Sequence, residues 1–212
     1  LLIIKMKIFV TGIAGLLGSN IARRLTKDHE IVGCDNLIGG LEDNIPTCDF
    51  HKIDMLDTKA VIKAMDGCEM VLHTAALPYE GLSVFSPAIV TQNIVGGTVS
   101  VASAAIANGI DMFINFSSMA RYGDQKAPFT EDMPTAPVDP YGFAKVQAEE
   151  QLAFLNKLHG LRYMTVVPHN VIGIGQRYMD PYRNVVAIMI NRMKQGKPIV
   201  IYGDGTQKRS FS

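Results

Sequence analysis

Short apolar runs and longer amphipathic stretches alternate along most of this chain. The short runs are rich in β-branched residues and predict buried strands, which we place at residues 7–10, 31–34, 51–53, 70–73, 112–116, 163–167 and 199–202. Between them, apolar residues recur at helical spacing and predict helices at residues 16–26, 58–65, 88–108, 141–158 and 184–195. Repeated strand-helix units of this kind indicate an α/β fold built on a parallel sheet.

The strand-helix rhythm changes near Pro168, where we place a domain boundary. We expect residues 1–167 to form the domain built on the parallel sheet and residues 168–212 to begin a smaller second domain. The composition around Ser212 carries no stop signal, so we expect the C-terminal remainder of the second domain to be missing.

The composition argues against several classes of partner. The chain has 212 residues with 20 Lys and Arg against 20 Asp and Glu, so its formal net charge is zero. This balance gives no reason to expect binding to nucleic acid or to an anionic membrane, and no apolar run reaches the roughly 20 residues that span a bilayer. Cys34, Cys48 and Cys68 have no metal-type spacing, so we expect no metal site and interpret them as reduced thiols of a cytoplasmic protein.

A glycine-rich turn lies between the first predicted strand and the first predicted helix. Gly12, Gly15 and Gly18 would let the backbone approach a pyrophosphate closely, while the helix N-terminus presents free N–H groups to it. Asp35 ends the second predicted strand roughly 20 residues later, where a carboxylate accepts hydrogen bonds from both ribose hydroxyls. Because such a carboxylate would repel a 2′-phosphate, the pattern predicts NAD rather than NADP. The alternatives are an ordinary glycine-rich turn and a strand-end cap.

A second group of residues predicts proton transfer. Tyr141 and Lys145 lie four positions apart on a predicted helix and therefore share one face. A phenol is a poor base at neutral pH, but a nearby ammonium stabilises the phenolate and lowers its pKa. Ser118 follows a predicted strand and can hydrogen-bond the same substrate oxygen. A solvated helix face is the alternative interpretation of the Tyr141 and Lys145 pair.

Small and polar residues at other strand ends complete the predicted cofactor site. Asp54 could reach the adenine edge, and Asn93 could hydrogen-bond from its helix toward the sheet. We interpret His73 as a packed residue rather than a catalytic one. The predicted NAD-binding residues are Gly12, Gly15, Leu16, Leu17, Gly18, Asp35, Asn36, Asp54, Met55, Thr74, Ala75, Ala76, Asn93, Tyr141, Lys145 and Pro168.

Taken together, these motifs resemble the extended short-chain dehydrogenase/reductase family, in its nucleotide-sugar epimerase/dehydratase branch. The motifs that carry the resemblance are residues 11–18, Asp35, and residues 73–76, 93–98, 117–123, 140–145 and 202–207. The resemblance implies a Rossmann doubly wound sheet, with residues 168–212 as part of a substrate-binding domain. It implies a catalytic triad of Ser118, Tyr141 and Lys145, and a substrate site formed by Ser118, Met119, Tyr141, Asn170 and Arg209.

The same resemblance indicates which of the reactions catalysed by this branch of the family fits the chain. Its 4,6-dehydratases carry an Asp-Glu pair directly after the catalytic Ser or Thr, and its decarboxylases carry a Glu there. Met119 and Ala120 occupy these positions and cannot do acid-base work. The resemblance therefore implies an NAD-dependent C4 epimerase acting on a nucleotide sugar, most simply a UDP-sugar. A one-way reductase and a non-catalytic dinucleotide sensor are the alternatives, although such sensors typically lose the tyrosine and lysine.

Relatives of this kind commonly dimerise through two helices. The resemblance implies a homodimer formed by the helix around residues 90–107 and the helix that carries Tyr141. Val95, Val99, Ala102 and Ile106 would supply its apolar face. The alternative is that this face packs only against its own sheet.

Overall fold

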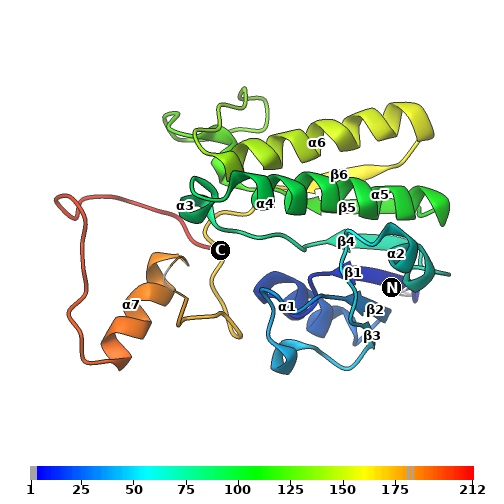
Figure 1. Ribbon diagram of the computed structural model, residues 1–212, viewed down its shortest axis with the longest axis horizontal. Helices are drawn as coiled ribbons and strands as arrows, with labels where there is room; N and C mark the ends of the chain where they lie inside the picture. Colours follow the sequence, from blue (N-terminus) through cyan, green and yellow to red (C-terminus); the bar gives the residue numbers. More distant parts are fainter. Residues whose placement is uncertain (1–3, 181, 183) are drawn as a thin grey trace.

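The computed structural model describes residues 4–180, 182 and 184–212 (Figure 1). Its centre is a parallel sheet of six strands in the order β3-β2-β1-β4-β5-β6. The strands are β1 (Lys7–Thr11), β2 (Glu30–Cys34), β3 (Asp49–His51), β4 (Met70–His73), β5 (Met112–Phe116) and β6 (Tyr163–Val166). The order reverses between β1 and β4, which defines the doubly wound Rossmann sheet that the alternation predicts.

Helices α1 (Leu16–Leu25), α2 (Thr58–Ala64), α5 (Gly97–Ala107) and α6 (Pro140–His159) cover the two faces of the sheet. The other helices are α3 (Glu80–Ser83), α4 (Pro87–Thr91) and α7 (Val185–Lys194), and α7 lies apart from the sheet (Figure 1). The larger core cluster joins one sheet face, through Phe9, Val71 and Phe113, to Val61 of α2 and Leu152 of α6. On the other face, α1 packs over a smaller cluster. Short 3-10 turns occupy Glu42–Asn44 and Met119–Tyr122.

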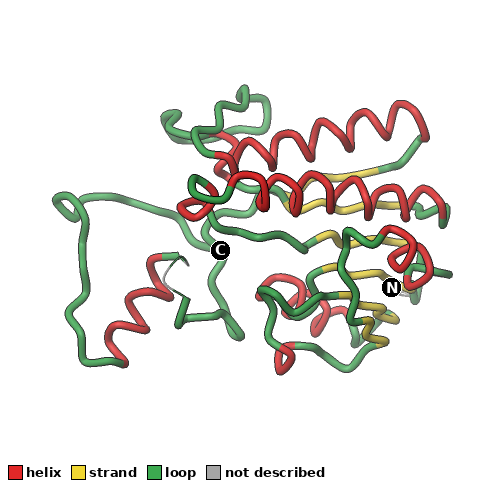
Figure 2. Tube along the Cα trace, viewed as in Figure 1, coloured by secondary structure: helices red, strands yellow, loops and turns green. Residues whose placement is uncertain are grey.

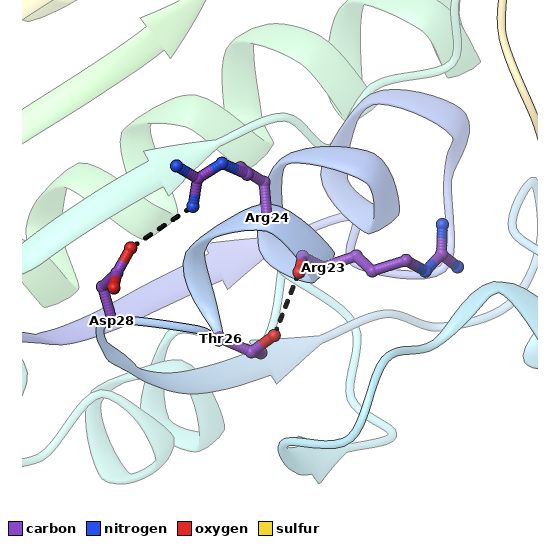
Figure 3. A network of polar contacts seen from close by, with 4 residues as sticks. All are labelled: Arg23, Arg24, Thr26 and Asp28. Atoms are coloured by element: carbon purple, nitrogen blue, oxygen red, sulfur yellow. Dashed lines mark hydrogen bonds and ion pairs between the residues drawn. The ribbon is translucent and has the colours of Figure 1, made fainter.

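Helix α1 ends in a small polar network, which Figure 3 shows in close view. Arg24 forms an ion pair of 3.3 Å with Asp28 one turn later. The Thr26 hydroxyl donates to the carbonyl oxygen of Arg23 at 3.1 Å. Both basic side chains lie in the last turn, where a positive charge complements the carbonyl end of the helix dipole. These contacts help to end α1 before β2 begins.

The predicted helix at residues 88–108 forms as one long element with an irregular middle. A π-helical turn at Gln92–Gly96 joins α4 to α5. By length and composition alone, the stretch Pro87–Ala107 could cross a bilayer. In the structure, however, Val101, Ala104 and Ala105 are fully buried in the larger core cluster, which is how a core helix of a folded domain packs.

The last part of the chain differs from its prediction. Residues 199–202 lie in loop conformation, and Figure 2 shows loop along the whole stretch that follows α7. Ile199, Val200 and Ile201 are exposed there, so the prediction of a strand was wrong. A β-strand is stable only with a hydrogen-bonded neighbour, and this apolar run pairs with no described strand. The predicted domain boundary at Pro168 stays a prediction.

Candidate active site

A cavity of about 520 Å³ opens at the carboxyl ends of β1, β2, β4 and β5. In open α/β sheets this edge is where ligands bind, at the point where the strand order reverses. The cavity brings together most of the predicted site residues: Gly12, Gly15, Leu16, Leu17, Gly18, Asp35, Asn36, Met55, Thr74, Ala75, Ala76, Asn93, Ser118, Tyr141, Lys145, Pro168 and Asn170. Asp54, Met119 and Arg209 do not line it.

The glycine turn forms one end of the cavity. Gly12 has a φ of +69°, and a Cβ on it would lie 2.7 Å from the Cα of Ala75. A Cβ on Gly18 would lie 2.4 Å from the carbonyl oxygen of Gly12. Helix α1 starts directly after Gly15 with no side-chain cap, so its first N–H groups stay available toward the cavity. This close-packed turn fits the pyrophosphate of a dinucleotide.

The Asp35 carboxylate hydrogen-bonds two loops beside the glycine turn. One carboxylate oxygen accepts the backbone N–H of Leu37 at 2.8 Å, and the other accepts that of Ala14 at 3.0 Å. Burial raises the pKa of Asp35, and the two backbone donors oppose this shift. Each oxygen keeps lone pairs for further donors, so the carboxylate can also accept hydrogen bonds from ribose hydroxyls.

Asp54 does not line the cavity, but it hydrogen-bonds Asn36, which does. Its carboxylate accepts from the Asn36 side-chain amide at 2.8 Å and from the backbone N–H of Leu56 at 2.9 Å. The strand β3 ends at His51, three residues earlier than Asp54 and two residues earlier than predicted. Asp54 therefore positions Asn36, which lines the cavity, and its proposed contact with adenine stays a prediction.

Hydrogen bonds also fix the floor of the cavity. The Thr74 hydroxyl donates to the carbonyl oxygen of Thr11 at 2.6 Å, and the Asn93 side chain accepts from the backbone of Leu77 at 2.9 Å. His73 is fully enclosed, with its ring nitrogens 2.9 Å from the Thr11 hydroxyl and 3.0 Å from that of Thr98. Burial, with the nearby Lys145, lowers the pKa of His73 to about 3. The His73 imidazole is therefore neutral and hydrogen-bonded through both ring nitrogens. It is a packed residue, as expected.

Helix α6 brings the tyrosine and the lysine to the other end of the cavity. Asp139 caps its N-terminus by accepting from the backbone of Gly142 at 2.8 Å. A Cβ on Gly142 would lie 2.7 Å from the carbonyl oxygen of Ala120, so α6 approaches the Ser118 loop very closely. Tyr141 and Lys145 are both buried, each 7% exposed. The sequence predicted that Tyr141 and Lys145 share a face and that Ser118 joins them, and all three residues line this cavity.

The electrostatics differ from the prediction that Lys145 lowers the pKa of Tyr141. Burial raises the pKa of Tyr141 to about 12; a hydrogen bond with Ser118 opposes this, while Glu80 and Asp139 add to it. The lysine Nζ donates to the carbonyl oxygen of Phe116 at 2.7 Å and lies 6.0 Å from the tyrosine ring centroid. Burial lowers the pKa of Lys145 to about 8, against the charge of Glu149. The phenol is therefore protonated at neutral pH, because burial is the largest influence on its pKa.

Sequence reasoning missed several residues around this group. Ser83 accepts the backbone N–H of Tyr141 at 3.2 Å, and Glu80 lines the cavity beside it. Glu149 forms an ion pair of 2.9 Å with Arg121 and a hydrogen bond with the Ser117 hydroxyl, on both sides of Ser118. A carboxylate one turn after Lys145 was a usable signal for Glu149. The four-residue helix α3 is too short for a periodic signal.

Of the predicted substrate-binding residues that follow the sheet, Asn170 lines the cavity and Arg209 does not. Asn170 lines the cavity with a φ of +38°, and its amide donates to His169 at 2.8 Å and to the carbonyl oxygen of Ser210 at 2.9 Å. Arg209 is exposed and donates to the carbonyl oxygen of Lys208 at 3.0 Å. The roles of Asn170, Met119 and Arg209 toward a substrate stay predictions.

The sheet order, the glycine turn and the cavity define a Rossmann-type dinucleotide-binding protein, and comparison with known proteins narrows this class. The family model of the NAD dependent epimerase/dehydratase family matches residues 8–212. The UDP-glucose 4-epimerase of Mycolicibacterium smegmatis is 35% identical over 219 residues, which cover 97% of this chain and 69% of that protein.

Two solved structures are similar over nearly the whole chain. The UDP-N-acetylglucosamine 4-epimerase from Methanobrevibacter ruminantium, in complex with UDP-N-acetylmuramic acid, gives a TM-score of 0.93 at 31% identity, covering 98% of this chain and 69% of that one. The UDP-glucuronic acid 4-epimerase from Bacillus cereus, in complex with UDP-glucuronic acid and NAD, gives 0.88 at 30% identity with the same coverage. The chain belongs to the NAD dependent epimerase/dehydratase family, and NAD is its cofactor.

Proposed function

We propose that this protein interconverts two UDP-sugars that differ in configuration at C4. The observation that carries the proposal is a cavity that has the glycine turn and Asp35 at one end and Ser118, Tyr141 and Lys145 at the other. A dinucleotide bound along this edge of the sheet would reach the second group with its nicotinamide. The 4-epimerases similar to this chain support the reaction type.

In the proposed reaction the phenolate of Tyr141 accepts the proton of the sugar C4 hydroxyl while that carbon loses a hydride. Since burial raises the pKa of Tyr141, the phenol must first lose its own proton, which the positive charges of Lys145 and of a bound nicotinamide would favour. NAD, when bound, supplies the hydride acceptor and the positive charge of the nicotinamide. Ser118 hydrogen-bonds the same sugar oxygen and the phenol, and the Lys145 ammonium lies 6.0 Å from the centroid of the tyrosine ring. Because Lys145 is held by the carbonyl oxygen of Phe116, its charge stays oriented toward the site. The resulting 4-keto sugar rotates in the cavity and presents its other face. Return of the hydride to C4 on that face, and of the proton from Tyr141 to the oxygen, completes the epimerisation.

The residues after Ser118 support epimerisation rather than loss of water. Met119 and Ala120 begin the 3-10 turn, and neither side chain can accept or donate a proton. A dehydratase needs such groups to take a proton from one carbon and to protonate the hydroxyl that leaves the next carbon. The three similar enzymes are named for glucose, N-acetylglucosamine and glucuronic acid, so the proposal extends to UDP-linked sugars of these three kinds.

The proposal also places the protein in the cytoplasm as a homodimer. The expected face needs a correction, because Ala102 is fully buried in the protein's own core and Ile106 packs against the same cluster. Exposed apolar side chains on α4 and α6, namely Ile89, Phe143, Phe154 and Leu158, support an interface with a second copy. Light scattering after size-exclusion chromatography would give twice the monomer mass for a dimer.

A panel of UDP-sugars tests the proposed reaction. We would incubate the protein with NAD and UDP-glucose, UDP-galactose, UDP-N-acetylglucosamine or UDP-glucuronate, and follow the anomeric and C4 protons by NMR. The proposal predicts interconversion of a C4 pair without net NADH and without loss of water or carbon dioxide. Binding of NAD with no change in any UDP-sugar would contradict it and would favour the one-way reductase.

A further inference from the structure

The sugar end of the cavity carries an acidic side chain that the proposed reaction does not use. Glu80 begins α3, lines the cavity together with Ser118 and Tyr141, and remains accessible. Its charge acts on Tyr141, because it helps to raise the pKa of that phenol. The reacting carbon must lie within hydrogen-bond reach of Tyr141. Glu80 therefore lines the same cavity end as Tyr141, where the proposed reaction places the sugar.

The backbone of Glu80 is fixed on both sides. The Ser83 hydroxyl donates to the carbonyl oxygen of Glu80 at 2.6 Å and accepts from the backbone of Tyr141 at 3.2 Å. The preceding residue, Tyr79, donates its hydroxyl to the Asp180 carboxylate at 3.0 Å. These bonds join α3 to helix α6 and to the segment after β6. A carboxylate carried on such a backbone is preorganised toward one region of the cavity.

Space is available next to this carboxylate. Gly81 also lines the cavity, and a Cβ on it would meet nothing within 4 Å. The other charged groups near Tyr141 are Asp139 at the start of α6 and Lys145 one turn further. Of these groups, Glu80 and Lys145 line the cavity, whereas the Asp139 carboxylate caps α6 outside it.

We propose that Glu80 selects the sugar: its carboxylate accepts hydrogen bonds from the hydroxyls of a neutral sugar and excludes a sugar that carries its own carboxylate. This inference rests on the proposed function. An ionised carboxylate only accepts hydrogen bonds, so sugar hydroxyls satisfy it and a uronate does not. Like charges in a partly desolvated cavity repel strongly, and such repulsion is how sites discriminate between similar ligands. All substituents of a pyranose lie within a few ångströms of C4.

The test compares Glu80→Gln with the unsubstituted protein, using UDP-glucose and UDP-glucuronate. Glu80→Asp keeps the charge, and Glu150→Gln removes the same charge from an exposed position of α6 outside the cavity. For each protein we would measure kcat/KM by NMR, the dissociation constant of both UDP-sugars by calorimetry, and thermal unfolding as a check of the fold.

Glu80→Gln is expected to raise the preference for UDP-glucuronate over UDP-glucose by about tenfold or more in both readouts. Glu80→Asp and Glu150→Gln should keep the original preference. Ordinary surface substitutions change such a ratio by about twofold. If Glu80→Gln changed the preference for UDP-glucuronate over UDP-glucose by no more than this, that result would overturn the inference. So would an unsubstituted protein that epimerises UDP-glucuronate as well as UDP-glucose. If the unsubstituted protein converts no UDP-sugar, the proposed function itself fails, which is a separate result.

Discussion

The substitution Gly18→Ala tests whether the close packing of the glycine turn requires a residue without a Cβ at position 18. Alanine favours a helix over glycine by about 1 kcal/mol, which alone would stabilise α1. Here, however, the new Cβ would lie 2.4 Å from the carbonyl oxygen of Gly12 and 2.7 Å from the Thr74 hydroxyl, against 3.4 Å for ordinary contact. The oxygen belongs to the backbone and cannot rotate away.

The clash should outweigh the gain in helix propensity. Overpacking of this kind costs about 1–3 kcal/mol, so we expect the free energy of unfolding to fall by up to about 2 kcal/mol. Since the displaced turn is also the proposed pyrophosphate site, we expect NAD to bind at least about tenfold more weakly, equivalent to about 1.4 kcal/mol.

Urea unfolding and calorimetric titration with NAD would measure both effects. Gly81→Ala is the matched control, because a Cβ there meets nothing within 4 Å and the backbone is helical. It should leave NAD binding unchanged. If Gly18→Ala were as stable as the original protein and bound NAD equally well, the reasoning about the turn would be wrong.

Three further results are expected. Tyr141→Phe should lower turnover by at least about 100-fold, as loss of a general base does, while calorimetry finds NAD binding nearly intact; normal turnover would remove Tyr141 as the base. Asp35→Ala should weaken NAD more than NADP in the same titration, and an equal loss would mean that Asp35 does not contact the ribose. The pKa of Lys145 is lowered to about 8 from 10.5, so the unfolded chain binds more protons between these values. Stability relative to Lys145→Met should therefore rise as the pH increases from 8 to 10.5 in urea unfolding; a flat difference would refute the lowered pKa.

The centre of the sheet was predictable because strands β1, β2 and β4 are buried on both faces and read as apolar runs. The predicted strands at residues 70–73 and 112–116 match β4 and β5 in their bounds. The run at residues 199–202 has the same local character but no described partner strand. Local patterns report the tendency to form a strand, whereas pairing depends on residues far away in the chain.

The candidate site was predictable where chemistry and spacing coincide. Gly12, Asp35 and Tyr141 carry recognisable patterns, and the cavity brings all three to one edge of the sheet. Glu80 and Ser83 carry no such pattern, because their relation to Tyr141 comes from the packing of α3 on α6. The raised pKa of Tyr141 was also out of reach, since burial is a property of the folded chain.

The central claim is that C4 is oxidised and reduced again within one active site. We would incubate the protein and NAD with the UDP-sugar that the panel identifies, deuterated at C4, and follow the label in the C4 epimer by mass spectrometry and NMR. The account predicts that deuterium remains at C4 of the product, with no net NADH and no conversion by Tyr141→Phe. Loss of the label to solvent, or inversion at another carbon, would contradict it.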